Sequence, residues 1–230
     1  MSSNNNLMSL IKIKMSANTA RQILKTTNLK IQGNALNSGK YGAVFNSNQK
    51  NYIVKIGKIN SNNENSLISE AEISEIASNL GIGPKVPVKP KIITHNGNDY
   101  VVIKMEKMDG TLLSLINSRN INDELKISLL QDAQDLLRIL HKQNICHRDL
   151  HLKNIMYKKK NDKYIIKIID FGQSYQQCSS SNILNNKLKL TSIINNLKRK
   201  QLRTRKPLRT IQPSHNSNYV PMPPQRMKLF

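Results

Sequence analysis

The feature that most constrains this chain is the string HRDLHLKN at residues 147–154, followed sixteen residues later by Asp170-Phe171-Gly172. Two carboxylates and a carboxamide thus stand on two short polar segments. Asn154 and Asp170 offer hard oxygen ligands of the kind that magnesium accepts. Asp149 offers a carboxylate that can take a proton from a hydroxyl. A polar loop assembled by chance is the alternative, but chance rarely produces both strings in this order and spacing.

Weaker motifs precede this pair in a fixed order. Residues 37–44, NSGKYGAV, place Gly39 and Gly42 where a backbone without side chains can approach phosphates closely. Lys55 ends the strand-like run Ile53-Val54-Lys55, and Glu70 lies in a helical stretch. Each motif is weak alone, because a Gly-x-x-Gly string is more often a turn and a strand lysine is usually solvated. The fixed order makes the combined signal specific.

From about Leu29 to Gly172, these motifs resemble the protein kinase superfamily, including small RIO-like kinases and the minimal kinases of large DNA viruses. The resemblance implies an α+β, bilobal fold. The N-lobe would hold five strands and one helix, and the C-lobe would be shortened and mainly helical. The implied activity is transfer of the γ-phosphate of Mg-ATP to a protein hydroxyl, with Ser/Thr favoured over Tyr. ATP and Mg²⁺ are the implied cofactors.

The resemblance also assigns roles to single residues. Asp149 would accept or orient the proton of the acceptor hydroxyl, and Lys55 would hold the α- and β-phosphates. Glu70 would orient Lys55, with Glu72 as the runner-up. Asn154 and Asp170 would bind magnesium. The nucleotide would contact Gly39, Gly42, Val44, Lys55 and Glu106.

Four basic residues of the first string have further assignments. Lys153 and His151 could each screen the transferred phosphoryl group, and a merely exposed Lys153 is an equally good interpretation. His147 would support the loop structurally and would not act as an acid or base. Arg148, before the presumed base, is typical of the protein-kinase side of the superfamily.

The chain departs from the family pattern after Asp170, which is its last acidic residue. The Ala-Pro-Glu motif and a later supporting aspartate are therefore absent, so the peptide-docking half of the C-lobe is expected to be reduced. Two other functions stay open. One is a pseudokinase that binds nucleic acid or another partner. The other is a small-molecule phosphotransferase, because Asp149-Leu150-His151 also suits the aminoglycoside-kinase type.

Hydrophobic periodicity and turn residues predict the elements. A short helix is expected over 16–27, and Ser66 is expected to cap a helix that runs to Leu80. Expected strands are 29–36, 41–47, 51–57, 90–95, 99–105, 155–157 and 164–169, and further helices are 123–142 and 181–202. The expected divisions are an N-terminal extension (1–28), an N-lobe (29–105), a hinge with the reduced C-lobe (106–202) and a disordered basic tail (203–230).

Composition adds a strongly basic segment to this plan. The formal net charge is +22, and residues 198–209 contain seven Lys or Arg among twelve. Such a segment would attract RNA, DNA or an acidic partner, or it would simply keep the protein in solution. No run of eighteen apolar residues predicts a transmembrane span, and no signal peptide is expected. Cys146 and Cys178 suggest no disulfide framework, so an intracellular, cytoplasmic location is expected, or a virion if the source is viral.

Overall fold

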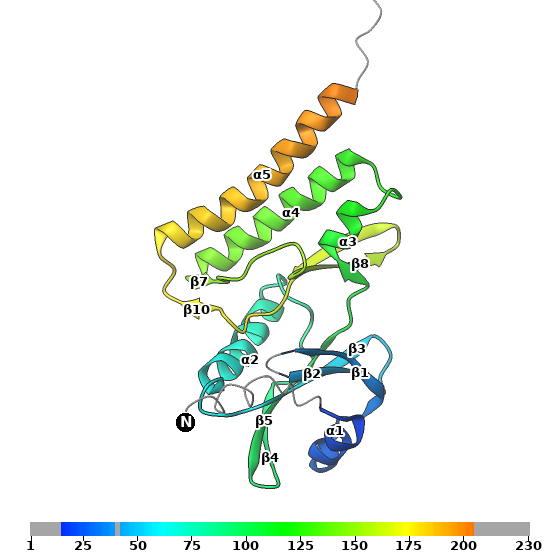
Figure 1. The fold of residues 1–230 in the computed structure, drawn as a ribbon, viewed down its shortest axis with the longest axis vertical. Coiled ribbons are helices and arrows are strands. Elements are labelled where there is room, and N and C mark those ends of the chain that lie inside the picture. Colours follow the sequence, from blue (N-terminus) through cyan, green and yellow to red (C-terminus); the bar gives the residue numbers. More distant parts are fainter. Residues whose placement is uncertain (1–14, 40–41, 205–230) are drawn as a thin grey trace, which may run out of the picture.

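The computed structural model describes residues 15–39 and 42–204. The chain folds into two lobes that are joined by residues 107–109 (Figure 1). A β-sheet dominates the N-terminal lobe, and two long helices dominate the C-terminal lobe. The α+β, bilobal fold with a shortened, mainly helical C-lobe is therefore confirmed.

Five antiparallel strands form the sheet of the N-terminal lobe, in the order β1-β2-β3-β5-β4. The sequence predicts all five. Asn96 and Gly97 join the last two strands with positive φ angles of 48° and 67°, which a type I′ turn requires. The strands are β1 (Ile31–Gly39), β2 (Gly42–Ser47), β3 (Tyr52–Lys58), β4 (Lys91–His95) and β5 (Asn98–Glu106).

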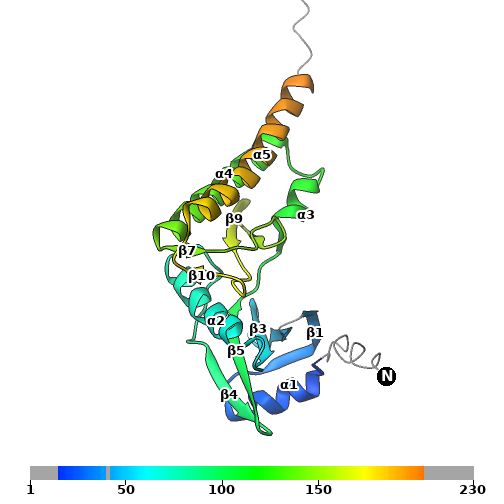
Figure 2. The same cartoon turned by 60° about the vertical axis from the view of Figure 1, so that its left-hand side comes forward.

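A helix packs on each face of this sheet (Figure 2). Successive side chains of a strand point to opposite faces, so Tyr100 and Val102 share one face while Val101 and Ile103 share the other. The first pair packs with α1, which comes from the predicted N-terminal extension, and the second pair packs with α2. These helical elements are α1 (Ala17–Ile23), the 3₁₀ turn η2 (Leu24–Thr26) and α2 (Glu64–Asn79).

Helix α2 begins earlier than the sequence predicts. Its N-cap is Asn63, not Ser66, and the Asn63 side chain donates to the Lys58 carbonyl at 2.9 Å instead of capping the helix. Ser66 lies within the first turns, where its hydroxyl donates to the carbonyl of Gly172. A serine that resembles a local cap therefore connects α2 to the segment after Asp170.

Helix α4 is the centre of the C-terminal lobe. It spans 123–142 as predicted, and the Asn122 side chain caps it by accepting from the Leu125 amide at 2.8 Å. Leu130 and Leu137 of its apolar face are buried in the largest core cluster. The elements of this lobe are β6 (Gly110–Thr111), α3 (Leu112–Asn117), α4 (Asp123–Lys142), β7 (Ile145–Cys146), β8 (Ile155–Lys160), β9 (Lys163–Ile168), β10 (Tyr175–Gln176) and α5 (Ser180–Thr204).

Helix α5 lies along α4, and its C-terminal turns extend beyond it (Figures 1 and 2). Leu190 and Ile194 are buried in the shared core, and Gln134 donates to Thr191 at 2.9 Å across the two helices. The predicted disordered tail falls almost wholly on residues 205–230, which lie outside the described residues. Neither α5 nor any other helix in the described part of the chain is long and apolar enough to cross a membrane.

The β8–β9 hairpin is longer than the two short strands that the sequence predicts. Pairing continues out to Lys160 and Lys163, and only Asn161 and Asp162 form the turn, with φ angles of 48° and 60°. These angles again fit a two-residue type I′ turn. Three successive lysines thus extend β8 instead of forming a loop, and β9 ends two residues before Asp170.

The two cysteines are paired, which corrects the expectation that they form no cross-link. A disulfide joins Cys146 and Cys178, whose Cα atoms lie 5.1 Å apart. Strand β7 pairs with β10, so Cys146 is opposite Tyr175 and close to the residues that follow it. Tertiary pairing brings the two cysteines together across a sequence separation of 32, so their spacing in the sequence does not indicate the bond. The pairing also removes the argument from cysteine usage for a reducing compartment.

Candidate active site

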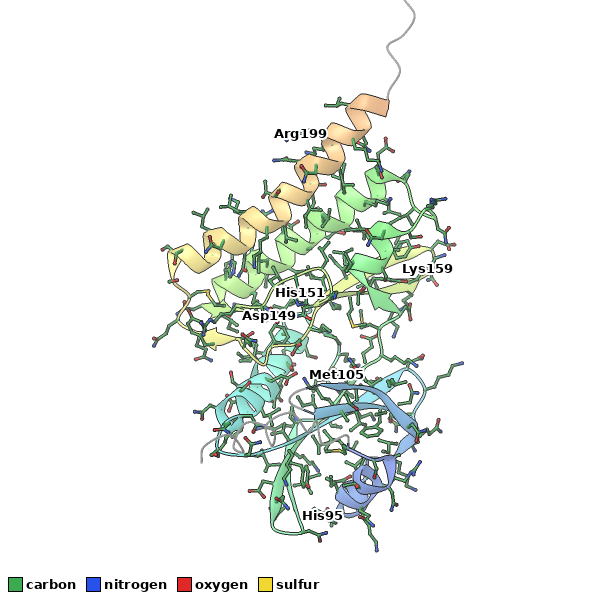
Figure 3. The ribbon with its side chains drawn as sticks, viewed as in Figure 1. His95, Met105, Asp149, His151, Lys159 and Arg199 are labelled. Carbon is green, nitrogen blue, oxygen red and sulfur yellow. A yellow bond between two sulfur atoms is a disulfide. The ribbon has the colours of Figure 1, made fainter. Side chains whose placement is uncertain are left out.

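A cavity of about 910 Å³ lies between the lobes. Both lobes line it: the sheet from one side, and the loops before β8 and after β9 from the other. In Figure 3, Met105 faces this region from the sheet, while Asp149 and His151 face it from the C-terminal lobe. All ten residues that the sequence nominates lie at this cavity, namely Gly39, Gly42, Val44, Lys55, Glu70, Glu106, Asp149, Lys153, Asn154 and Asp170.

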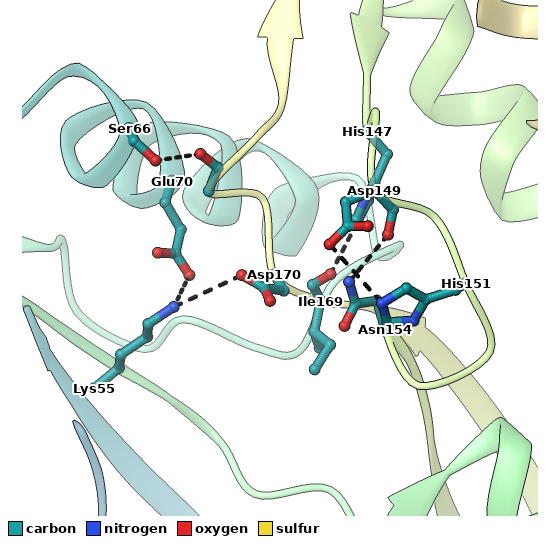
Figure 4. Close-up of polar contacts among 10 residues, drawn as sticks. Lys55, Ser66, Glu70, His147, Asp149, His151, Asn154, Ile169 and Asp170 are labelled. Carbon is teal, nitrogen blue, oxygen red and sulfur yellow. Dashed lines mark hydrogen bonds and ion pairs between the residues drawn. The ribbon is translucent and has the colours of Figure 1, made fainter. Parts of the chain in front are cut away.

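Lys55 of β3 reaches two carboxylates (Figure 4). Its ammonium forms an ion pair with Glu70 of α2 and lies 3.9 Å from a carboxylate oxygen of Asp170. The Glu70 side chain is only 3% exposed, and burial raises its pKa, while the nearby charge and hydrogen bond of Lys55 oppose that rise. The runner-up, Glu72, is exposed on the same helix. The fold therefore brings Glu70, not Glu72, to Lys55.

Asp149 and Asn154 are held by the loop that joins β7 and β8. The side-chain nitrogen of Asn154 donates to the Asp149 carbonyl at 3.0 Å, which leaves the Asn154 side-chain oxygen free to face a ligand. The Asn154 backbone carbonyl accepts from the Ile169 amide at 2.9 Å, so this loop is tied to the residue before Asp170. The Asp149 side chain is 45% exposed, and His151 lies 3.8 Å from one of its oxygens.

His147 connects the loop that joins β7 and β8 to the end of the segment that leads into Asp170. It is buried, and its Nε2 lies 2.8 Å from the Ile169 carbonyl, to which the neutral ring donates. Burial lowers the pKa of His147, and its Nδ1 has no hydrogen-bond partner among the residues that the structure describes. A neutral imidazole with its proton on Nε2 fits these contacts. The predicted structural role of His147 agrees with this placement.

Two residues of the site have backbone angles that side chains rarely adopt. Arg148 has φ 59° and Asp170 has φ 65°. Left-handed backbone at residues other than glycine costs free energy and persists where surrounding contacts fix it. Here the bonds of His147, Asn154 and Ile169 supply those contacts. Arg148 precedes Asp149, and Asp170 is itself strained. The fold therefore places both carboxylates at the cavity at a cost in backbone free energy.

The two glycines before Lys55 have different surroundings. A side chain at Gly42 would collide with the backbone of Ile56 and Gly57, so β2 and β3 can approach only because this position is glycine. A side chain at Gly39 would meet open space, because this glycine borders the cavity. Only Gly39 therefore leaves room that a ligand could fill. Residues 40–41 between them are outside the described part of the chain.

The segment between the lobes offers a backbone donor that sequence reasoning missed. The Glu106 carboxylate accepts from Lys158 at 2.6 Å, and its amide donates to the Lys85 carbonyl at 2.8 Å. Met108, two residues on, lines the cavity, and its amide forms no hydrogen bond within the described residues. A backbone group carries no side-chain signature, so no motif could have identified Met108.

The oxygen groups at the cavity suit a magnesium ion that is shared with phosphates. Asp170 supplies a carboxylate that is 46% exposed, and Asn154 supplies an amide oxygen. In the described part of the chain, no group of three or more His, Cys, Asp or Glu side chains could hold a metal ion alone. Magnesium is usually bound by one or two carboxylates together with substrate phosphates, so this sparse pair fits.

Comparison with known proteins gives the family. The family model for the protein kinase domain matches residues 31–193. The mitogen-activated protein kinase kinase kinase dlk-1 of Caenorhabditis elegans is 30% identical over 145 residues, which are 62% of this chain and 14% of that protein. A putative serine/threonine-protein kinase of Acanthamoeba polyphaga mimivirus is 28% identical over 147 residues, 61% of this chain and 25% of the relative.

A third relative is the probable serine/threonine-protein kinase pXi of Dictyostelium discoideum, 27% identical over 157 residues, 66% of this chain and 22% of that protein. The chain thus spans a quarter or less of the length of these relatives. The match to the family model covers both lobes and every nominated residue of the cavity. The chain therefore belongs to the protein kinase domain family.

Proposed function

We propose that this kinase uses Mg-ATP and transfers the γ-phosphate to a Ser or Thr hydroxyl of a protein. The observation that carries the proposal is the convergence of Lys55, Asp149, Asn154 and Asp170 at one cavity. Two of the relatives carry serine/threonine-protein kinase names, which favours Ser/Thr over Tyr. We also propose an intracellular location, because ATP is an intracellular substrate.

The nucleotide would lie between the sheet and the segment that joins the lobes. Val44, Met105 and Ile169 offer apolar surface for a base, and the amide of Met108, which has no hydrogen-bond partner within the described residues, offers it a donor. Open space beside Gly39 leaves room for phosphates close to the backbone. Lys55 would hold the α- and β-phosphates, with Glu70 fixing the position of its ammonium.

The charge of the phosphates would be met by three groups. Bound magnesium would neutralise part of that charge, and Asp170 and Asn154 would hold the ion. Lys55, 3.9 Å from Asp170, would supply a fixed positive charge on the sheet side. On the other side, Lys153 or His151 would screen the transferred group. Because these groups are already held by the fold, little reorganisation is needed when the reaction occurs.

Asp149 would orient the acceptor hydroxyl and take its proton. Its carboxylate is about half exposed, so it is accessible to an incoming side chain. The alternatives have weaker support. A pseudokinase normally lacks one of the groups that this cavity retains, and the family match covers both lobes of a protein kinase. A small-molecule acceptor would leave the same chemistry in place.

The test is phosphate transfer from labelled ATP with magnesium to a panel of acidic and basic proteins. Asp149→Asn should retain ATP binding but lose about 10²- to 10⁴-fold in transfer rate, the usual loss for a well-placed acid–base group. Asp162→Asn makes the same chemical change on the exposed β8–β9 turn and should transfer at the parent rate. If Asp149→Asn transferred phosphate as fast as the parent, Asp149 would not be the group that takes the proton of the acceptor hydroxyl.

A second candidate function is polyanion binding by the basic segment 198–209. Lys198 and Arg199 are exposed on the part of α5 that extends past α4, and Arg199 is labelled there in Figure 3. Residues 205–209 lie outside the described part. The proposed partners are RNA, DNA or an acidic protein, bound through phosphates or carboxylates without base recognition.

A further inference from the structure

The acidic residues of this chain are confined to its first 170 residues. All fourteen lie in the described part, and none follows Asp170, whereas eleven Lys or Arg do. Four of the fourteen line the cavity, namely Glu70, Glu106, Asp149 and Asp170. Glu70 is paired with Lys55, and Glu106 is paired with Lys158. Asp149 and Asp170 remain, and the proposed function already uses both.

The rim of the cavity around Asp149 is neutral or basic. The side chains of Thr111, Ser114 and Asn117 line it on the α3 side, and Gln173 lines it on the side of the segment after Asp170. None of these carries a charge. Along the described chain from there to the end of α5, every charged side chain is basic. Among the described residues of the cavity, a substrate with Arg or Lys next to its hydroxyl would therefore find no free carboxylate except Asp149 and Asp170, which the proposed function already uses.

Basic side chains, by contrast, are available near Asp149. His151 is 47% exposed and lies 3.8 Å from an Asp149 oxygen. Lys153, two residues further on, lines the cavity and is exposed. In the described part of the chain, Lys153 forms no ion pair with an acidic side chain. Lys55, in contrast, is already engaged by Glu70, so Lys153 is a cavity lysine whose charge is available to a ligand.

Building on the proposed function, we infer that this kinase acts on hydroxyls flanked by acidic residues, and that Lys153 is a specificity-determining residue that selects them. An acidic side chain next to the acceptor hydroxyl would reach the rim, where Lys153 attracts it and where, among the described residues that line the cavity, Asp149 and Asp170 are the only carboxylates without a lysine partner of their own. One ion pair between exposed groups is worth up to about fivefold in a binding or rate constant at low salt, and salt screens it.

The experiment uses the full-length protein and three peptides of equal length, each with one serine. The serine is flanked by Asp and Glu in the first, by Ala and Gly in the second, and by Lys and Arg in the third. We expect kcat/KM to fall in that order, with a ratio of up to about fivefold between the acidic and the neutral peptide. The ratio should shrink as the salt concentration rises.

Variants separate selection from a general catalytic effect. Lys153→Ala should lower the acidic-to-neutral ratio towards one, whereas a role for Lys153 on the transferred phosphoryl group alone would slow both peptides equally and leave the ratio unchanged. Lys160→Ala, at the exposed end of β8 and away from the cavity, is the matched control and should keep the parent ratio.

The outcomes distinguish this inference from the proposed function on which it rests. Transfer to the basic or neutral peptide as efficient as transfer to the acidic one would overturn the inference and leave the kinase activity standing. An acidic preference that survives Lys153→Ala would overturn the role of Lys153. Transfer to none of the peptides, with no autophosphorylation by protein that binds ATP, would overturn the proposed function and the inference together.

Discussion

Lys55 stands between two carboxylates that differ in burial. Glu70 is almost completely buried and directly paired with it, whereas Asp170 is about half exposed and 3.9 Å away. A buried carboxylate without its cation would be strongly unfavourable, so Glu70 and Lys55 depend on each other. If Asp170 binds magnesium as proposed, it would give up its weaker contact with Lys55. The difference in burial would then separate a structural partner of Lys55 from a ligand-binding one.

The mutual dependence of these residues can be measured by a double-mutant cycle. We expect Glu70→Gln to reduce phosphate transfer by nearly as much as Lys55→Met, and the double variant to be little worse than either, because both changes remove one shared arrangement. Glu72→Gln, the same change two residues away on the exposed face of α2, should retain the parent rate. Losses that simply add, or a coupled loss from Glu72, would show that Glu70 is not the partner.

At the scale of elements, the segment between Asp170 and α5 is short and held from several sides. Ser66 and Ser69 of α2 donate to the carbonyls of Gly172 and Ser174. Asn144, just after α4, accepts from the amides of Gln177 and Cys178, and the disulfide of Cys178 closes the far end of the segment. An activation segment of conventional length and its Ala-Pro-Glu anchor are replaced here by direct ties to α2 and β7.

The disulfide should contribute measurably to stability. It closes a loop with a sequence separation of 32, and a loop of that size is expected to contribute about 3.5 kcal/mol by restricting the unfolded chain. Cys178→Ser should therefore lower the free energy of unfolding in urea by about that amount under oxidising conditions. A reducing agent should destabilise the parent and leave the variant unchanged. Equal midpoints for the parent with and without reductant would contradict this expectation.

Elements with a strong local signal could be predicted, and those defined by their partners could not. The apolar period of 123–142 and the Asn96-Gly97 turn specify α4 and the β4–β5 hairpin without tertiary information. Strands β7 and β10 are two residues each and exist only because they pair with one another. The same limit explains the missed disulfide. Short polar contacts such as Ser66 with Gly172 are likewise invisible in sequence.

The nominated site residues were found because protein kinases carry them in short motifs that follow one another in a fixed order, and each motif specifies particular side chains. Their roles remain predictions, although the fold gathers them around one cavity. Met108 was missed because the group that it offers is a backbone amide, which any residue type except proline could supply. Lys153 was nominated for a different reason, the charge of the phosphoryl group. Its lack of an acidic partner became visible only when every described carboxylate could be placed.

For the whole molecule, the distribution of charge separates a catalytic body from a basic end. Deleting residues 202–230 removes six Lys or Arg beyond the helical contact with α4. We expect the shortened chain to bind ATP as the parent does but to bind a single-stranded RNA oligonucleotide more weakly. Each lost phosphate contact should reduce the slope of log affinity against log salt by about 0.7. Equal affinity and slope for both chains would leave the basic end without this role.

Helix α2 belongs to the cores of both lobes. Leu67 and Ala71 pack with β5, while Ile73 and Ala77 share an apolar cluster with Phe171 and the C-terminal lobe. Swinging the sheet away from the C-terminal lobe would therefore expose apolar surface on one side of this helix. We therefore expect wide opening of the cleft to be costly, and the nucleotide of the proposed reaction to leave with the two lobes still in contact through α2. If the chain turns over ATP as proposed, we expect release of the product nucleotide to be slower than the chemical step, which a pre-steady-state burst of phosphate transfer would reveal.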